Sequence, residues 1–213
     1  MSTNLNPEKA LIFRIVHRDN VPWILEHGMC CRNARTQDPN YRTIGNPDLI
    51  DKRRRRTVPI PPGGTLSDYI PFYFTPFTPM LLNIKTGYGG VKKLPNEDVV
   101  IFVSSLPALN QKGIPFLFTD CHAYLVNANF YDDSADLGRL DWGILQNRDF
   151  KRDPDDPGKM ERYQAEALVH NHIPVESFIG LACYTDRVYG QVEELVNNHG
   201  LELQVVKRAG WYF

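Results

Sequence analysis

Residues 98–104, DVVIFVS, carry five consecutive apolar residues in a run that is too short for an ordinary helix. A strand of this kind is typical of a sheet position that is covered on both faces, because neither side of it favours contact with water. The run therefore predicts a sheet with packing layers on both sides. A chain of 213 residues is long enough to build one such domain.

Residues 10–28, ALIFRIVHRDNVPWILEHG, predict a strand, a polar step and a short helix. Apolar residues alternate along the strand, so we expect one buried face, which His17 ends. Asp19 or Asn20 offers an oxygen to cap the helix, and Gly28 is a natural C-terminal stop. His17 is then either a contact to a polar ligand or an ordinary core histidine.

The remaining apolar patterns favour strands over helices. We expect strands at 70–75, 114–119, 163–170, 178–184, 201–206 and 210–213, and helices at 79–86 and 186–198. A helix is an alternative at 163–170, because Gln, Ala, Glu and Leu favour helices. Since helices and strands do not alternate regularly, we predict an α+β fold with a largely antiparallel sheet and flanking helices.

Two long polar segments, 29–68 and 120–158, interrupt these patterns. Irregular segments of this length inside a compact domain are usually functional or disordered. The first contains four consecutive arginines, Arg53–Arg56. This run is either part of a functional loop or a solvated patch that attracts phosphates without a catalytic member.

The overall charge excludes a generally basic nucleic-acid-binding protein, because 24 Lys and Arg balance 25 Asp and Glu. Cys30, Cys31, Cys121 and Cys183 form no CxxC pair, so we expect reduced thiols and no metal site. The N-terminus has no apolar signal region, and no apolar run reaches about 18 residues. These features predict a cytoplasmic protein with no membrane partner.

No phosphate-binding loop, GxGxxG, HExxH or serine-hydrolase signature is present. Long blocks of the chain instead resemble the ADP-ribosyltransferase superfamily and, within it, the DarT toxins that modify single-stranded DNA. These blocks are LNPEKALIFRIVHRDNVPWILEHG, GNPDLIDKR, GGTLSDYIPFYFTPFTPML, NRDFKRDPDDPGKMERYQAEAL and the C-terminal GWYF. The resemblance implies one ADP-ribosyltransferase domain over 1–213, with a split central sheet, an NAD-binding element at about 29–68 and an acceptor loop at about 119–166.

The order His17, Tyr73, Glu166 is also similar to that of the poly(ADP-ribose) polymerases, although Arg18 stands where that family has glycine. These resemblances imply NAD as co-substrate and no metal. The NAD contacts that they imply are Val16, His17, Arg18, Asn20, Arg53 and Tyr73. Tyr73 would stack on the cationic nicotinamide ring, or else simply pack among the neighbouring phenylalanines.

Glu166 is the carboxylate that the resemblance makes catalytic, because a carboxylate stabilises the positive charge that develops on the ribose. The competing carboxylates are Glu161 and 153–156, and a surface position for Glu166 is the structural alternative. Arg53 is implied as the second catalytic residue. Arginine is a surprising base because it normally stays protonated, so charge stabilisation is an open alternative.

The resemblance also assigns DNA contacts to the acceptor loop. Aromatic side chains there can stack on bases and cations can contact phosphates. The candidates are His122, Tyr124, Trp142, Arg148, Lys151 and Arg152 in the loop, with Lys92 and Lys93 extending the groove. Each aromatic residue has loop packing as its alternative role.

The predicted function is therefore the transfer of ADP-ribose from NAD to a base, thymine foremost, in single-stranded DNA. The resemblance implies a toxin whose mark a macrodomain antitoxin removes. Three alternatives stay open: a transferase of the same fold acting on RNA or protein, an NAD glycohydrolase, and a nucleic-acid-binding module without catalysis.

Overall fold

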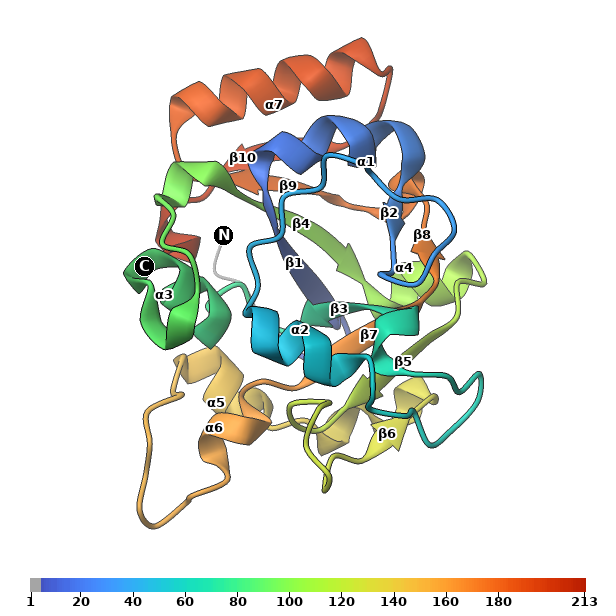
Figure 1. Cartoon of the computed structure of the whole chain (residues 1–213), viewed down its shortest axis with the longest axis vertical. Helices are drawn as coiled ribbons and strands as arrows, with labels where there is room; N and C mark the ends of the chain where they lie inside the picture. Colours follow the sequence, from blue (N-terminus) through green and yellow to red (C-terminus); the bar gives the residue numbers. More distant parts are fainter. Residues whose placement is uncertain (1–4) are drawn as a thin grey trace.

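A computed structural model describes residues 5–213 (Figure 1). Its centre is an eight-stranded sheet of order β10-β9-β4-β1-β3-β7-β5-β6, in which only the β10–β9 pair is parallel among these residues. The strands are β1 Leu11–His17, β3 Tyr69–Tyr73, β4 Val99–Ser105, β5 Phe116–Thr119, β6 Phe130–Tyr131, β7 Glu166–His170, β9 Gly180–Cys183 and β10 Gln204–Lys207. A separate ribbon pairs β2 Met29–Cys30 with β8 His172–Ile173.

The predicted apolar strand at 98–104 is β4, and every residue of β4 is buried. Its neighbour β1 is covered on both faces too, since Ile12 and Val16 are as inaccessible to water as Phe13. The expectation of a single buried face on β1 is therefore wrong. The strand lies between β4 and β3 inside the sheet, so both of its faces meet packing layers.

The sheet is split between β1 and β3. Seven residue pairs join β1 to β4, whereas only Phe13 and Tyr73 pair between β1 and β3. On its other side β3 pairs with β7 through five residues, ending at Tyr73 and Glu166. The two halves of the sheet therefore diverge beyond one shared pair, as the predicted split sheet requires.

Helices flank this sheet (Figure 1). They are α1 Val21–His27, α2 Pro47–Arg53, α3 Pro79–Thr86, α4 Leu106–Gln111, α5 Trp142–Asn147, α6 Lys159–Arg162 and α7 Asp186–Asn198. The predicted helices at 79–86 and 186–198 are confirmed. The Thr78 hydroxyl caps α3 by accepting from the backbone N–H of Leu81, and Gly87 ends it in the left-handed conformation.

Other expectations need correction. The 29–68 segment contains α2, and 120–158 contains β6 and α5. No residue of α2 is buried. A helix without a buried face does not need the repeating apolar residues by which helices are recognised in a sequence. Residues 210–213 form no strand and instead belong to a 3₁₀ turn, Ala209–Trp211, and its flanks. The strand at 163–170 is confirmed over the helical alternative by β7.

A polar step does precede α1, but it is a 3₁₀ turn, Arg18–Asn20. Neither proposed cap acts on α1, because the Asn20 side chain makes no capping hydrogen bond and bonds a loop instead. The four cysteines are free thiols. Among residues 5–213, no helix has the length and apolar character needed to cross a bilayer.

Candidate active site

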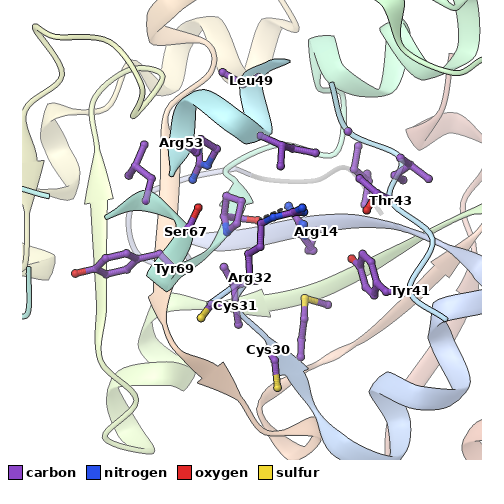
Figure 2. A pocket seen from close by; sticks show the side chains of 18 of the residues that line it. Arg14, Cys30, Cys31, Arg32, Tyr41, Thr43, Leu49, Arg53, Ser67 and Tyr69 are labelled. Atoms are coloured by element: carbon purple, nitrogen blue, oxygen red, sulfur yellow. Dashed lines mark hydrogen bonds between the residues drawn. The ribbon is translucent and has the colours of Figure 1, made fainter. Parts of the chain in front are cut away.

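A large cavity opens where the sheet splits (Figure 2). It encloses about 1300 Å³ of empty space including its open mouth, and its walls come from β1, β3, β7 and the 29–68 segment. Arg53, Tyr73 and Glu166, which the sequence places far apart, all line it. The cavity brings together the residues on which the predicted chemistry depends.

Glu166, at the start of β7, is 2% exposed. Its Oε1 atom accepts from the backbone N–H of Ala123 at 3.0 Å and lies 3.0 Å from Nδ1 of His122. Its Oε2 atom accepts from Nη1 of Arg53 at 2.8 Å. The surface alternative for Glu166 is thereby excluded. Oε2 has one donor among the described residues, which leaves a lone pair for a ligand hydroxyl.

Arg53 occupies the last turn of α2 and reaches Glu166 across the cavity. The helix is placed by Asn46, whose side chain accepts from the N–H of Leu49, and by Pro47 in the first turn. Nη1 of Arg53 is committed to Glu166, while Nη2 is buried with no hydrogen-bond partner among the described residues. Arg53 therefore holds the carboxylate and offers one further donor to a ligand.

Burial by itself raises the pKa of the Glu166 carboxyl, but the charge of Arg53 and the hydrogen bonds from His122 and Ala123 outweigh it. The net result lowers that pKa from 4.5 to about 2. The carboxyl group is thus ionised at every physiological pH. An ionised carboxylate in a buried site is the form that stabilises a neighbouring positive charge.

This shift predicts acid sensitivity. A carboxyl whose pKa is depressed on folding adds stability above its unfolded pKa of 4.5, and that stability is lost as the pH falls toward 2. We expect Glu166→Gln to remove a component on the order of 3 kcal/mol from the pH dependence of unfolding in that window. Urea unfolding of both proteins at pH 5, 4 and 3 measures it. Parallel pH profiles of the two proteins would contradict the assignment.

Tyr73 lines the cavity next to Glu166 and is half-buried. Burial and the Glu166 charge raise the pKa of Tyr73 to about 12, while Arg14 and Arg53 oppose the rise. The phenol is therefore neutral at pH 7. The alternative of core packing alone does not account for a ring that borders an open cavity.

The polar step after β1, Arg18–Asn20, lies outside the lining of this cavity. Val16 is fully buried, and none of Val16, His17, Arg18 and Asn20 lines the cavity. Nδ1 of His17 accepts from the N–H of Asp19 at 3.1 Å, and burial lowers the pKa of His17. These four expected NAD contacts are not among the residues that line the cavity, and their contact with NAD stays a prediction; in this structure His17 caps a turn.

Arg18 pairs with Asp98 at 3.2 Å and lines a groove against α7. From β1, the cavity receives Arg14 and Ile15 instead. Arg14 donates to the carbonyl of Pro71 at 3.1 Å, and its buried Nε has no partner among the described residues. The sequence pattern was interpreted as a strand with a single buried face, and this interpretation did not identify Arg14 as a cavity residue. The strand is in fact covered on both sides.

Asn20 acts on the site indirectly. Its side chain donates to the carbonyl of Arg42 and accepts from the N–H of Arg42, at 2.9 and 2.8 Å. Tyr41 and Thr43, on either side of Arg42, line the cavity. Asn20 therefore fixes the loop that forms one wall of the site.

We expect Asn20→Ala to raise the KM for NAD about tenfold with a smaller change in kcat. The reason is that two buried hydrogen bonds to a binding loop are lost, at roughly 1–3 kcal/mol. Steady-state kinetics at varied NAD concentration measures KM and kcat separately. Glu26→Ala, at an exposed position of α1 that does not line the cavity, is the control. A fall in kcat at unchanged KM would refute the wall role.

The comparisons with known proteins decide the family. A family model for the ssDNA thymidine ADP-ribosyltransferase DarT matches residues 13–213. The chain is 53% identical to an Escherichia coli O127:H6 protein named DNA ADP-ribosyl transferase, over all of this chain and 97% of that protein. The chain belongs to the DarT family.

Solved structures agree. The Thermus sp. 2.9 DarT complex with ADP-ribosylated ssDNA matches with a TM-score of 0.89 and 34% identity, over 97% of this chain and 98% of that one. The same protein in complex with NAD⁺ matches with a TM-score of 0.84 and 33% identity, over 97% and 99%. These matches confirm the predicted fold, the enzyme class and NAD as the co-substrate of this DarT family member.

The predicted DNA contacts fall into two groups. His122 lines the cavity and Tyr124 is near it, with Nζ of Lys52 5.8 Å from the Tyr124 ring centroid. The others lie off the cavity; they are Lys92, Lys93, Trp142, Arg148, Lys151 and Arg152. Trp142 packs edge-on against Phe74, and its indole N–H donates to the carbonyl of Leu137. Trp142 therefore packs within its loop, which is its alternative role, and its contact with DNA stays a prediction.

Arg148 is the C-cap of α5, and its guanidinium lies 3.3 Å from the centre of the Phe77 ring. Lys151 and Arg152 are exposed in the following loop. Glu161, the competing carboxylate, does not line the cavity. Within residues 5–213, no cluster of three or more His, Cys, Asp and Glu side chains is arranged to hold a metal ion.

Proposed function

We propose that this DarT family member transfers ADP-ribose from NAD to a thymine base in single-stranded DNA, with Glu166 and Arg53 as its catalytic residues. The observation that carries the proposal is the buried Arg53–Glu166 pair at the split of the sheet, in a cavity that Tyr73 also lines. Family membership over 13–213 supplies the reaction class and the acceptor. The whole chain, 1–213, then acts as one catalytic domain.

In this reaction the bond between ribose C1′ and the nicotinamide nitrogen breaks, and the electron pair leaves with nicotinamide. Positive charge develops on the ribose. Oxygen Oε2 of Glu166 is placed to accept a hydrogen bond from a ribose hydroxyl and to stabilise that charge. Tyr73, neutral and at the edge of the cavity, offers its ring face to the cationic nicotinamide.

Arg53 fits charge stabilisation better than proton abstraction. Its Nη1 donates to a carboxylate, which favours the protonated guanidinium, and arginine is rarely deprotonated in any case. The unpartnered Nη2 is free to donate to a thymine carbonyl oxygen as the ring nitrogen loses its proton. The thymine nitrogen then attacks C1′, and the proton is released to solvent.

The NAD diphosphate needs cations that are not already neutralised. Arg14 and Arg32 line the cavity, and among residues 5–213 neither forms an ion pair. They are therefore the residues that we assign to the diphosphate.

The acceptor approaches from the 119–166 segment, where His122 lies against Glu166 and Tyr124 follows it. A base must leave the duplex stack before its ring nitrogen can be reached, which explains a requirement for single strands. We assign to the DNA backbone the predicted cations that do not line the cavity; they are Arg148, Lys151, Arg152, Lys92 and Lys93.

Modified thymine blocks template copying, so the activity is that of a toxin. We propose that it acts in the cytoplasm, where NAD and single-stranded DNA occur together, and that a macrodomain antitoxin reverses the modification. Co-expression of a macrodomain hydrolase tests this directly. Growth rescue with loss of the mark supports the pairing, and continued toxicity contradicts it.

The experiment that tests the reaction is incubation with NAD and thymine-containing oligonucleotides, followed by mass spectrometry. We expect a mass gain of one ADP-ribose on single strands only. Modification of RNA or protein instead would favour the other acceptors, and nicotinamide release without any adduct would favour a glycohydrolase. DNA binding that ignores NAD and weakens steeply with salt would favour a binding module.

A further inference from the structure

Of the four arginines in the run, the proposed reaction uses only Arg53, and Arg56 is the other one that is partly buried. Three residues beyond Arg53, it is half-buried, whereas Arg54 and Arg55 are exposed. Its Nη2 donates to the carbonyl of Leu125 at 2.9 Å and lies 3.4 Å from that of Val126. The side chain therefore ties the segment that follows α2 to a turn about 70 residues away.

The backbone of Arg56 is itself held firmly. Its carbonyl accepts from the N–H of Leu66 at 2.9 Å, which joins it to the turn that leads into β3. Beyond it, Thr57 pairs with Thr65 and closes a short hairpin. The Arg56 guanidinium therefore extends from a backbone segment that is itself hydrogen-bonded. It contacts the turn at residues 122–128, which we call the acceptor turn.

The acceptor turn is anchored at two ends. At its start, the N–H groups of His122 and Ala123 bond the carbonyl of Glu161 and the carboxylate of Glu166. Toward its far end, Ala128 packs against an apolar cluster that includes Val58 and Leu66. The tip itself is held from another segment by Arg56 through the carbonyls of Leu125 and Val126, and Val126 is 90% exposed. Loss of Arg56 would therefore free the tip of the turn while the Glu166 end keeps its bonds.

We propose that Arg56 is a positioning residue that holds the acceptor turn in place for the incoming base. The inference rests on the proposed function. ADP-ribosyl transfer requires the base nitrogen at the ribose C1′, whereas hydrolysis requires only water there. A mobile acceptor turn therefore lowers transfer and leaves cleavage of NAD intact, so that water takes the ribose in place of thymine. In that side reaction water bonds C1′, nicotinamide leaves with the electron pair, and a proton is released.

The experiment measures two products in one reaction: nicotinamide released and oligonucleotide modified. For Arg56→Met we expect transfer to fall about 10- to 100-fold, the range for small displacements of a reacting group. We also expect the yield of modified DNA per nicotinamide to fall, with the KM for NAD changed less than twofold. Arg56→Lys, which keeps the charge and one donor, should recover part of the yield.

Arg55→Met is the matched control. It removes the same charge from the same run, but Arg55 is exposed and pairs only with Asp51 one turn earlier on α2 among the described residues. An equal loss in Arg55→Met would show a general attraction for DNA and overturn the inference. So would an unchanged yield per nicotinamide in Arg56→Met. Absence of transfer by the unmodified protein would instead refute the proposed function.

Arg56→Met could also fail by unfolding, and thermal denaturation of each variant detects this. If Arg56→Met is unfolded, the yield of modified DNA per nicotinamide in Arg56→Lys is the test of the positioning role. A reduced yield per nicotinamide in folded Arg56→Lys supports the positioning role, and the yield of the unmodified protein overturns it.

Discussion

Glu166→Gln is expected to lower DNA modification by about 1000-fold, the scale on which a single electrostatic stabiliser of a transition state acts. The substitution keeps the shape of the side chain and removes its negative charge. Glutamine also leaves the buried Arg53 without an anion, so thermal unfolding should shift to lower temperature by the loss of a buried ion pair. Mass spectrometry of modified oligonucleotide measures the rate.

Glu161→Gln is the control for that experiment. Glu161 is the nearest competing carboxylate in the chain, and it lies outside the cavity lining. We expect it to keep transfer within about threefold, consistent with substitutions away from a reacting centre. Equal losses in both variants would move the catalytic assignment away from Glu166. Retained transfer in Glu166→Gln would eliminate it.

Arg53→Met is expected to lower transfer by about 100-fold or more and to change its pH dependence. With Arg53 present, the pKa of Glu166 is lowered to about 2, so Glu166 contributes no inflection between pH 5 and 8. Without Arg53, the burial that raises this pKa loses its largest opponent. The residual activity of the variant should therefore rise with pH as Glu166 ionises.

Nicotinamide release measured from pH 5 to 8 tests this prediction. Arg54→Met is its control, because Arg54 is exposed and meets Asp51 only at 4.0 Å. We expect Arg54→Met to follow the pH profile of the unmodified protein. A flat profile in Arg53→Met would show that Arg53 does not hold the charge of Glu166. An equal loss of transfer activity in Arg54→Met and Arg53→Met would show that Arg53 has no specific catalytic role.

The acceptor turn contacts both the proposed catalytic carboxylate and the proposed positioning arginine. Ala123, at its start, donates to Glu166, and Leu125, near its end, accepts from Arg56. Arg53 and Arg56 thus reach the same region from one short segment, Arg53 to the carboxylate and Arg56 to the turn. The 29–68 and 119–166 segments thus contact each other through these two arginines.

Much of the fold was predictable from local patterns. The buried run at 98–104, the capped helix at 79–86 and the amphipathic helix at 186–198 all have strong local signals, and all are confirmed. Helix α2 was missed because no residue in it is buried, and an exposed helix has no apolar period to detect. Residues 210–213 carry aromatic residues typical of strands, yet they form a turn that packs on the core.

Long blocks of the sequence resemble one family, and this resemblance is enough to predict the family, the reaction and the candidates Glu166 and Arg53. The three-dimensional contacts were needed to show that Arg14 is the charged residue of the first strand that lines the cavity, and that Arg53 and Arg56 contact different parts of the site. Strand β1 is buried on both faces, so alternation cannot distinguish Arg14 from His17. That choice depends on the single Phe13–Tyr73 pair at which the sheet splits, a contact between segments 60 residues apart.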